Sequence, residues 1–248
     1  MAETPFDRYT IVVIQQSGAF LHESALTRCA ATISVVAMAA TTAFLLWRYP
    51  ALPDILPVHF GPHGFPNGWQ FRTIPRVFIP VFLQTGIFVA GMLVGLLLLS
   101  RKDATTATAL PDARAAVTAT EAVVLMSTIW VVVQSYTAYA LVRLWSGIGS
   151  NLGRGYTAFE IGAVVVTALV GYRAHRRLAR PEPLPYIPAH WRLGQLYCNA
   201  DDPALFVPTR DGRRWTLNFG RPAAAILLGG ILVVGVVAPT VMLALTLR

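Results

Sequence analysis

Charged side chains are scarce in this sequence. They make up 13% of its 248 residues, whereas hydrophobic residues make up 55%, and the mean hydropathy is +0.55. A soluble domain carries about 25% charged residues, so this composition excludes an ordinary soluble globular protein. It is the composition of a protein whose apolar surface faces lipid, and we expect the lipid bilayer to be its main partner.

Cysteine is nearly absent as well. Cys29 and Cys198 are the only two, which excludes a disulfide framework and indicates free thiols. The net charge of +8 would suit nucleic-acid binding, but the sequence has no basic–aromatic tract, and we expect no nucleic acid among its partners. Phosphate-binding glycine loops, G-x-S-x-G and H-E-x-x-H are also missing from the sequence. Their absence lowers the expectation of an enzyme without excluding one.

Long apolar runs are what the sequence has in abundance. A helix that crosses the hydrocarbon core needs about 20 apolar residues, and five segments meet this requirement. We therefore predict an all-α membrane protein with about five transmembrane helices. The predicted spans are Ala30–Trp47, Val77–Ser100, Ala115–Trp145, Tyr156–Tyr172 and Ala223–Leu247.

The distribution of Lys and Arg predicts the orientation. If the N-terminus is cytoplasmic, fourteen of the twenty basic residues lie on the inner side, so the positive-inside rule favours N-in, C-out in a bacterial cytoplasmic (inner) membrane. The predicted organisation is a cytoplasmic or interfacial segment (1–28), an N-terminal domain of two spans (29–100) with an outer loop (48–76), two further spans (101–172), a basic cytoplasmic module (173–221) and a last span (222–248).

The cytoplasmic module contains the run "LFVPTRDGRRWTLNF". Asp211-Gly212 between two strand-like stretches predicts a small β-hairpin with a type I′ turn, and Pro208 confines its first strand to a sheet edge. The acidic pair before Pro203 is more typical of turn capping than of cation binding. We expect Arg210, Arg213 and Arg214 to contact anionic lipid headgroups or, alternatively, a protein partner.

The outer loop contains the stretch "LPVHFGPHGFPNGW", which predicts a rigid cap rich in proline and glycine. His59 and His63 would share one face of a helix, as in metal-binding pairs, but the intervening Gly61-Pro62 disfavours a helix. A turn could still bring both imidazoles together, and zinc would then need a third ligand, for which Glu160 lies at a suitable depth and Asp54 is a second possibility. The favoured interpretation is structural, with His59 hydrogen-bonding backbone groups and shaping the cap over the helices.

Several polar residues of the predicted spans lie at the depth of this loop. Glu160 is costly inside a membrane, and an ion pair with Arg143 would offset part of that cost. If a polar pocket exists, we expect it beneath the outer loop. The candidate ligand-binding residues are His59, Trp69, Gln84, Tyr139, Arg143 and Glu160.

Two stretches resemble known families. "ALPDILPVHFGPHGFPNGW" resembles the N-terminal domain of SdpI-type bacterial membrane proteins, which reads L-P-x-x-I-P-x-H-(F/W)-N-x-x-G-x-x-(D/N)-G-(W/Y). Gly61 replaces an Asn of that pattern, and His63 lies outside it. "HWRLGQLYCNADDPALFVPTRDGRRWTLNFGRP" resembles a C-terminal module of unknown function in related multi-pass proteins, with the pattern W-x-L-G-x-x-Y-x-N-x-D-D-P-x-x-F-V-P followed by W-T-x-N-F-G-x-P.

The resemblance implies a receptor or an immunity protein, because SdpI itself confers immunity against a secreted peptide toxin and acts in signalling. Such a protein would bind a peptide or small molecule at its outer face, alone or as a homo-oligomer. The alternative is a membrane-embedded zinc hydrolase, in which His59, His63 and Glu160 hold a metal that activates water.

Overall fold

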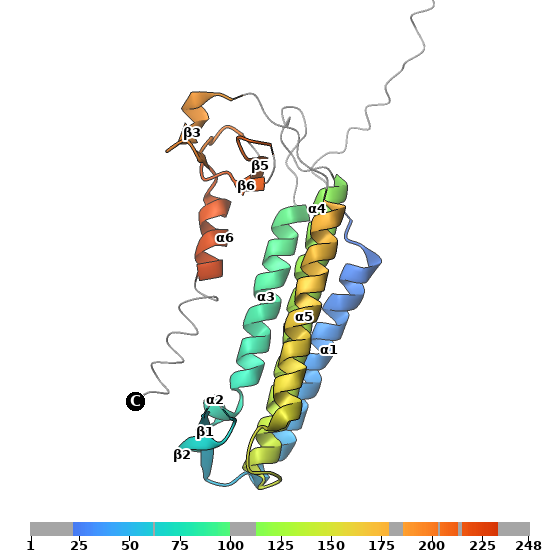
Figure 1. Cartoon of the computed structure of the whole chain (residues 1–248), viewed down its shortest axis with the longest axis vertical. Coiled ribbons are helices and arrows are strands. Elements are labelled where there is room, and N and C mark those ends of the chain that lie inside the picture. Colours follow the sequence, from blue (N-terminus) through green and yellow to red (C-terminus); the bar gives the residue numbers. More distant parts are fainter. Residues whose placement is uncertain are drawn as a thin grey trace, which may run out of the picture.

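Four long helices dominate the computed structural model, which describes residues 22–61, 63–99, 113–178, 186–202, 204–212 and 215–232. They form an up-and-down bundle in which α4 packs against each of the other three, antiparallel to α3 and α5 and parallel to α1 (Figure 1). All four are long and apolar enough to cross a membrane, as expected of a multi-pass membrane protein. The helices are α1 (Ala25–Arg48), α3 (Ile79–Leu99), α4 (Ala113–Trp145) and α5 (Gly153–Arg177).

These helices confirm four of the predicted spans and extend two of them. Helix α1 begins at Ala25, before the predicted start, because the Ser24 hydroxyl caps it by accepting from the Thr27 amide at 3.1 Å. Helix α5 continues to Arg177 through the basic run that follows its apolar part. The predicted last span begins as α6 (Pro222–Leu232), and the rest of it lies outside the described residues, as does residue range 1–21.

The outer loop (48–76) contains an antiparallel hairpin that was not predicted from the sequence. Strand β1 (Ile55–Phe60) pairs with β2 (Pro66–Phe71). The prolines and glycines of this loop are typical of turns and not of strands. In addition, the register shifts around His59 break the alternation that identifies a strand. The short helices η1 (Tyr49–Ala51) and α2 (Ile74–Val77) connect the hairpin to α1 and α3.

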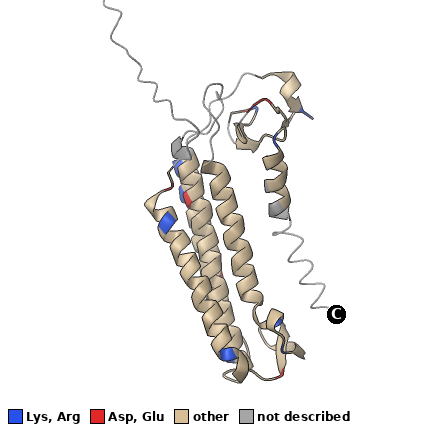
Figure 2. Ribbon diagram, turned by 180° about the vertical axis from the view of Figure 1, so that it is seen from behind, with Lys and Arg blue, Asp and Glu red and all other residues tan. Residues whose placement is uncertain are grey.

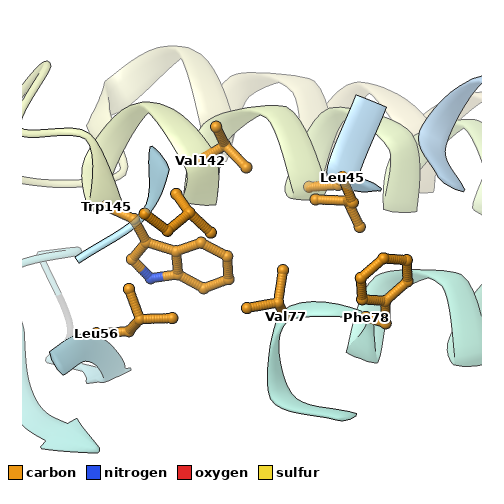
Figure 3. Close-up of a cluster of buried hydrophobic side chains, with 8 residues drawn as sticks. Leu45, Leu56, Val77, Phe78, Val142 and Trp145 are labelled. Atoms are coloured by element: carbon orange, nitrogen blue, oxygen red, sulfur yellow. The ribbon is translucent and has the colours of Figure 1, made fainter. Parts of the chain in front are cut away.

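A hydrophobic cluster fastens the hairpin to the bundle (Figure 3). A two-stranded hairpin alone is marginally stable in water, but Leu56 of β1 is fully buried and packs with side chains from α1, α2 and α4. The Trp145 indole adds a hydrogen bond of 2.9 Å from Nε1 to the Pro57 carbonyl oxygen. The buried members of the cluster are Leu45, Leu52, Leu56, Val77, Phe78, Ala138, Val142 and Trp145.

A small module lies at the other end of the bundle, next to the start of α6 (Figure 1). It consists of η2 (Pro188–His190) and two hairpins, β3 (Trp191–Arg192) with β4 (Leu196–Tyr197) and β5 (Phe206–Pro208) with β6 (Trp215–Leu217). The predicted hairpin is therefore present, and in a two-stranded sheet Pro208 is on an edge. The predicted type I′ turn is wrong, because Gly212 has a positive φ (+63°) and Asp211 does not.

Charged residues lie toward the ends of the bundle helices, and the middle of these helices has none (Figure 2). The β1–β2 hairpin and the α4–α5 connection share one end, and the start of α1, the end of α5 and the small module share the other (Figure 1). This arrangement agrees with the predicted division of the connections between two sides.

Candidate functional site

The β1–β2 hairpin is organised around His59. The His59 Nδ1 atom hydrogen-bonds Asn67 Oδ1 on the opposite strand, and His59 is paired in register with Gly68. A Cβ atom on residue 68 would lie 2.9 Å from the Cβ of His59, so glycine is required for the histidine to fit. The partner of His59 is thus a side chain of the opposite strand and not the backbone groups that were expected.

The tip of the hairpin is tied to the α4–α5 connection. Gly64 adopts φ +75°, donates its amide to the Gly61 oxygen at 2.9 Å, and accepts a hydrogen bond of 3.2 Å from the Leu152 amide. These contacts place His63, which precedes Gly64, over the start of α5.

Arg72 holds the base of the hairpin, a role that the sequence did not indicate. Its Nη1 donates to the carbonyl oxygens of Tyr49 (2.9 Å) and Leu52 (2.6 Å), and its Nη2 contacts Asp54 Oδ1 at 3.1 Å. The guanidinium also lies over the Tyr49 ring, 5.0 Å from its centroid. In the sequence, Arg72 counted only as one of the basic residues that set orientation.

Two adjoining hollows lie between the hairpin and the bundle. The first has a volume of about 880 Å³ and is bordered by polar side chains, among them His63, Arg154 and Glu160. The second, of about 640 Å³, is largely apolar and reaches Trp145. Phe60, Leu152 and Tyr156 line both hollows.

The polar side of the first hollow is defined by Glu160. Its Oε1 accepts a hydrogen bond of 2.7 Å from the Tyr156 hydroxyl, which also lies 3.4 Å from the Thr137 hydroxyl. Glu160 is half-buried and has no cationic partner within the described part of the chain. The hollow therefore offers a carboxylate to a ligand.

The other predicted site residues do not converge on this hollow. Arg143 lies over the Tyr139 ring, 6.0 Å from its centroid, so the predicted Arg143–Glu160 ion pair is not formed and that prediction is wrong. Tyr139 and Trp69 are exposed on the surface. Gln84 is fully buried in the bundle, where its Nε2 donates to Ser135 Oγ at 2.8 Å.

The predicted zinc ligands are only partly brought together. His63 and Glu160 line the same hollow, but His59 is not among its lining residues and is directed to Asn67. Across the described ranges, no three His, Cys, Asp or Glu side chains are grouped as a metal site would require. This geometry gives the zinc hydrolase no support.

Of the three predicted lipid-contact residues of the small module, Arg210 is the one that the structure describes. The Arg210 guanidinium stacks over the Tyr186 ring at 4.2 Å from the centroid, and Arg213 and Arg214 lie outside the described residues. In the acidic pair, Asp202 Oδ1 accepts from the Ala204 amide at 2.8 Å, as expected for turn capping.

Comparison with protein families matches residues 36–85 to a domain of unknown function (DUF1648). The match covers the second half of α1, the complete β1–β2 hairpin and the first turns of α3, and it includes the stretch "LPDILPVH", in which Leu56 replaces the Ile of the quoted pattern. No curated protein and no solved structure matches the chain.

Proposed function

We propose that this chain is an SdpI-like receptor or immunity-type protein of the bacterial cytoplasmic membrane, which binds an amphipathic ligand with a cationic group at its hairpin end. The observation that carries the proposal is the pair of adjoining hollows, of which one is apolar and the other contains Glu160. The apolar part of the ligand occupies the second hollow, against Trp145. Its cationic group pairs with the carboxylate.

The depth of Glu160 supports an amphipathic ligand. Glu160 lies seven residues after the start of α5 at Gly153, which corresponds to about 10 Å along a helix. A ligand that reaches it must enter the apolar layer while keeping its charge near water. Amines with an apolar body and cationic peptides have this character.

The proposed orientation is N-in and C-out with five spans, the fifth continuing from α6. The hairpin end then faces outward, and the module of β3 to β6 lies in the cytoplasm, where it reports binding or anchors the protein. The apolar composition of α6 supports this arrangement, because its eleven residues are followed by an apolar sequence up to Leu247.

Photolabelling of the full chain in lipid nanodiscs tests the proposal. A photoreactive decylamine should label peptides of the second hollow, such as that containing Phe60, in preference to a matched photoreactive decanol. Glu160→Gln should lower amine labelling by about fivefold, the size of one partly exposed ion pair. Glu23→Gln, which removes an exposed acid at the opposite end of α1, serves as the control. Equal labelling by amine and alcohol would contradict the proposal.

A further inference from the structure

A third hollow lies at the opposite end of the bundle, between α4 and α5 and beside the start of α1. Its volume is about 200 Å³, below the roughly 300–1,000 Å³ of a typical small-molecule pocket. It can therefore enclose only part of a larger molecule. The lining residues are Leu26, Thr118, Glu121, Ala122, Leu125, Val170, Arg173, Ala174 and Arg177.

The charges around this hollow sum to one positive charge. Arg173 and Arg177 lie four residues apart, and therefore on one face of α5. Arg177 Nη1 pairs with Glu121 Oε1 at 3.5 Å, and Glu121 Oε2 accepts a hydrogen bond of 3.0 Å from the Ser24 hydroxyl. Arg173 has no ion pair in the described parts of the chain, so its charge remains available to an anion.

The remaining walls of the hollow are apolar and continue onto a surface that faces lipid. Leu26, Leu125 and Val170 form these walls. Next to them along α5, Val166 is 47% exposed and Leu169 is 59% exposed, as expected of side chains that contact acyl chains. A molecule seated at Arg173 would therefore have hydrocarbon beside it.

We propose that this hollow binds one anionic phospholipid of the leaflet at that end of the bundle. The Arg173 guanidinium donates to a phosphodiester oxygen, and an acyl chain lies along Val166 and Leu169. The net positive charge selects an anionic lipid over a zwitterionic one, because the ammonium group of the latter neutralises its phosphate. The apolar walls favour a lipid over a free phosphate ion.

Native mass spectrometry of the purified full chain tests this assignment. When phosphatidylglycerol and phosphatidylcholine are added at equal concentrations, the protein should retain one molecule of phosphatidylglycerol in preference to phosphatidylcholine. Arg173→Gln should lower that retention by about fivefold, the effect of one arginine near an anionic surface. The matched control is Arg176→Gln, because Arg176 lies on the same turn of α5 but is directed to Tyr172, with Nη1 3.4 Å from its hydroxyl.

A second variant separates the hollow from general surface charge. Val170→Phe fills the hollow without changing any charge, and it should also lower retention of phosphatidylglycerol. The proposal is overturned if Arg176→Gln lowers retention as much as Arg173→Gln, if Val170→Phe has no effect, or if both lipids are retained equally. Displacement of the lipid by millimolar inorganic phosphate would also overturn it, because the site would then recognise a free anion.

Discussion

At the residue scale, the most constrained position of the hairpin is Gly68. Its partner across the strands is His59, and a side chain at residue 68 would meet the Cβ of that histidine at 2.9 Å. Such a contact cannot be relieved by rotating a side chain, because both Cβ atoms are fixed to the backbone. The hairpin must therefore open or twist to accept any larger residue.

We expect Gly68→Ala to lower the free energy of unfolding by about 1–3 kcal/mol, the usual cost of overpacking. Gly86→Ala is the matched control, since a Cβ on Gly86 of α3 meets no atom within 4 Å and alanine favours a helix by roughly 0.5–1 kcal/mol. Thermal unfolding of both variants in detergent checks the prediction. The two substitutions should shift the midpoint in opposite directions, and equal shifts would contradict this account.

Tyr197 gives the small module a dependence on alkaline pH. Burial raises the pKa of this phenol above its ordinary value of 10.0, and the donation to Asp202 Oδ2 at 2.8 Å adds to the effect, while the hydrogen bond from Asn199 opposes it. A raised pKa in the folded state means that the folded module holds the phenolic proton more tightly than the unfolded chain. Its contribution to stability is present below pH 10 and is lost as the pH rises beyond that value.

The expected result is a module that loses stability between about pH 10 and the raised pKa of Tyr197. Tyr197→Phe removes the titrating group and should weaken this pH dependence, although the variant is less stable at neutral pH because it lacks the bond to Asp202. Chemical unfolding at pH 8 and at pH 11, followed by tryptophan emission, measures the difference. Parallel losses in the wild type and the variant would assign the alkaline transition to other groups.

At the element scale, the sequence predicted the four long helices and the β5–β6 hairpin, but it did not predict the β1–β2 hairpin. Apolar length identified four spans because a membrane imposes that length. The same reasoning assigned residues 48–76 to a loop, because Pro57, Pro62, Pro66 and the irregular pairing near His59 obscure the period of two. The strands there are stabilised by the burial of Leu56 and by the hydrogen bond from Trp145 to the Pro57 carbonyl oxygen. That bond spans 88 residues of sequence and has no local signature.

The same reasoning from helix length and depth predicted a polar pocket beneath the outer loop, but not which side chains line it. The position of Glu160 along its helix predicted that it lies at the same end of the bundle as the outer loop. In the structure, His63 and Glu160 line one hollow at that end. Depth gives no information on which way a side chain faces around its helix. Arg143 and Tyr139 consequently lie together on the surface.

Arg72 connects two elements, since it joins the hairpin to the chain that leaves α1. Its fork reaches Tyr49 O, Leu52 O and Asp54 Oδ1 together, which the single ammonium of lysine cannot reproduce. We expect Arg72→Lys to destabilise the protein by about 1–3 kcal/mol, because carbonyl acceptors lose their partner. Thermal unfolding in detergent provides the test, with the exposed Arg154→Lys as a control that should leave the midpoint unchanged.

In the small module, the buried side chain of Asn218 explains the W-T-x-N-F-G pattern. Asn218 is fully buried, donates from Nδ2 to the oxygens of Asn199 and Ala204, and accepts the amides of Asn199 and Gly220 at Oδ1. A Cβ on Gly220 would lie 2.4 Å from the Asn199 carbonyl carbon. The W-T-x-N-F-G pattern therefore places an amide and a close backbone contact where the two hairpins meet.

At the scale of the whole molecule, the arrangement of the helices leaves two orientations in the membrane. The hairpin end has Arg48, Arg72, Arg76, Arg143 and Arg154, and several of these are engaged with the protein itself. Arg48 contacts the Ser146 hydroxyl at 3.0 Å, and Arg72 binds backbone carbonyls. The opposite end has more basic residues, including the last turn of α5. The positive-inside rule therefore supports the proposed orientation, in which that end lies in the cytoplasm.

Reporter fusions to the full chain distinguish the two orientations. Alkaline phosphatase fused after Arg248 should be active, because an odd number of spans after a cytoplasmic N-terminus brings the C-terminus outside, whereas a fusion within the inner loop near Lys102 should be inactive. Reversed activities would place the hairpin and its hollows in the cytoplasm, and an outer ligand could not reach Glu160. Two inactive fusions would mean that the chain after α6 does not cross, so that the protein has four spans and both termini inside.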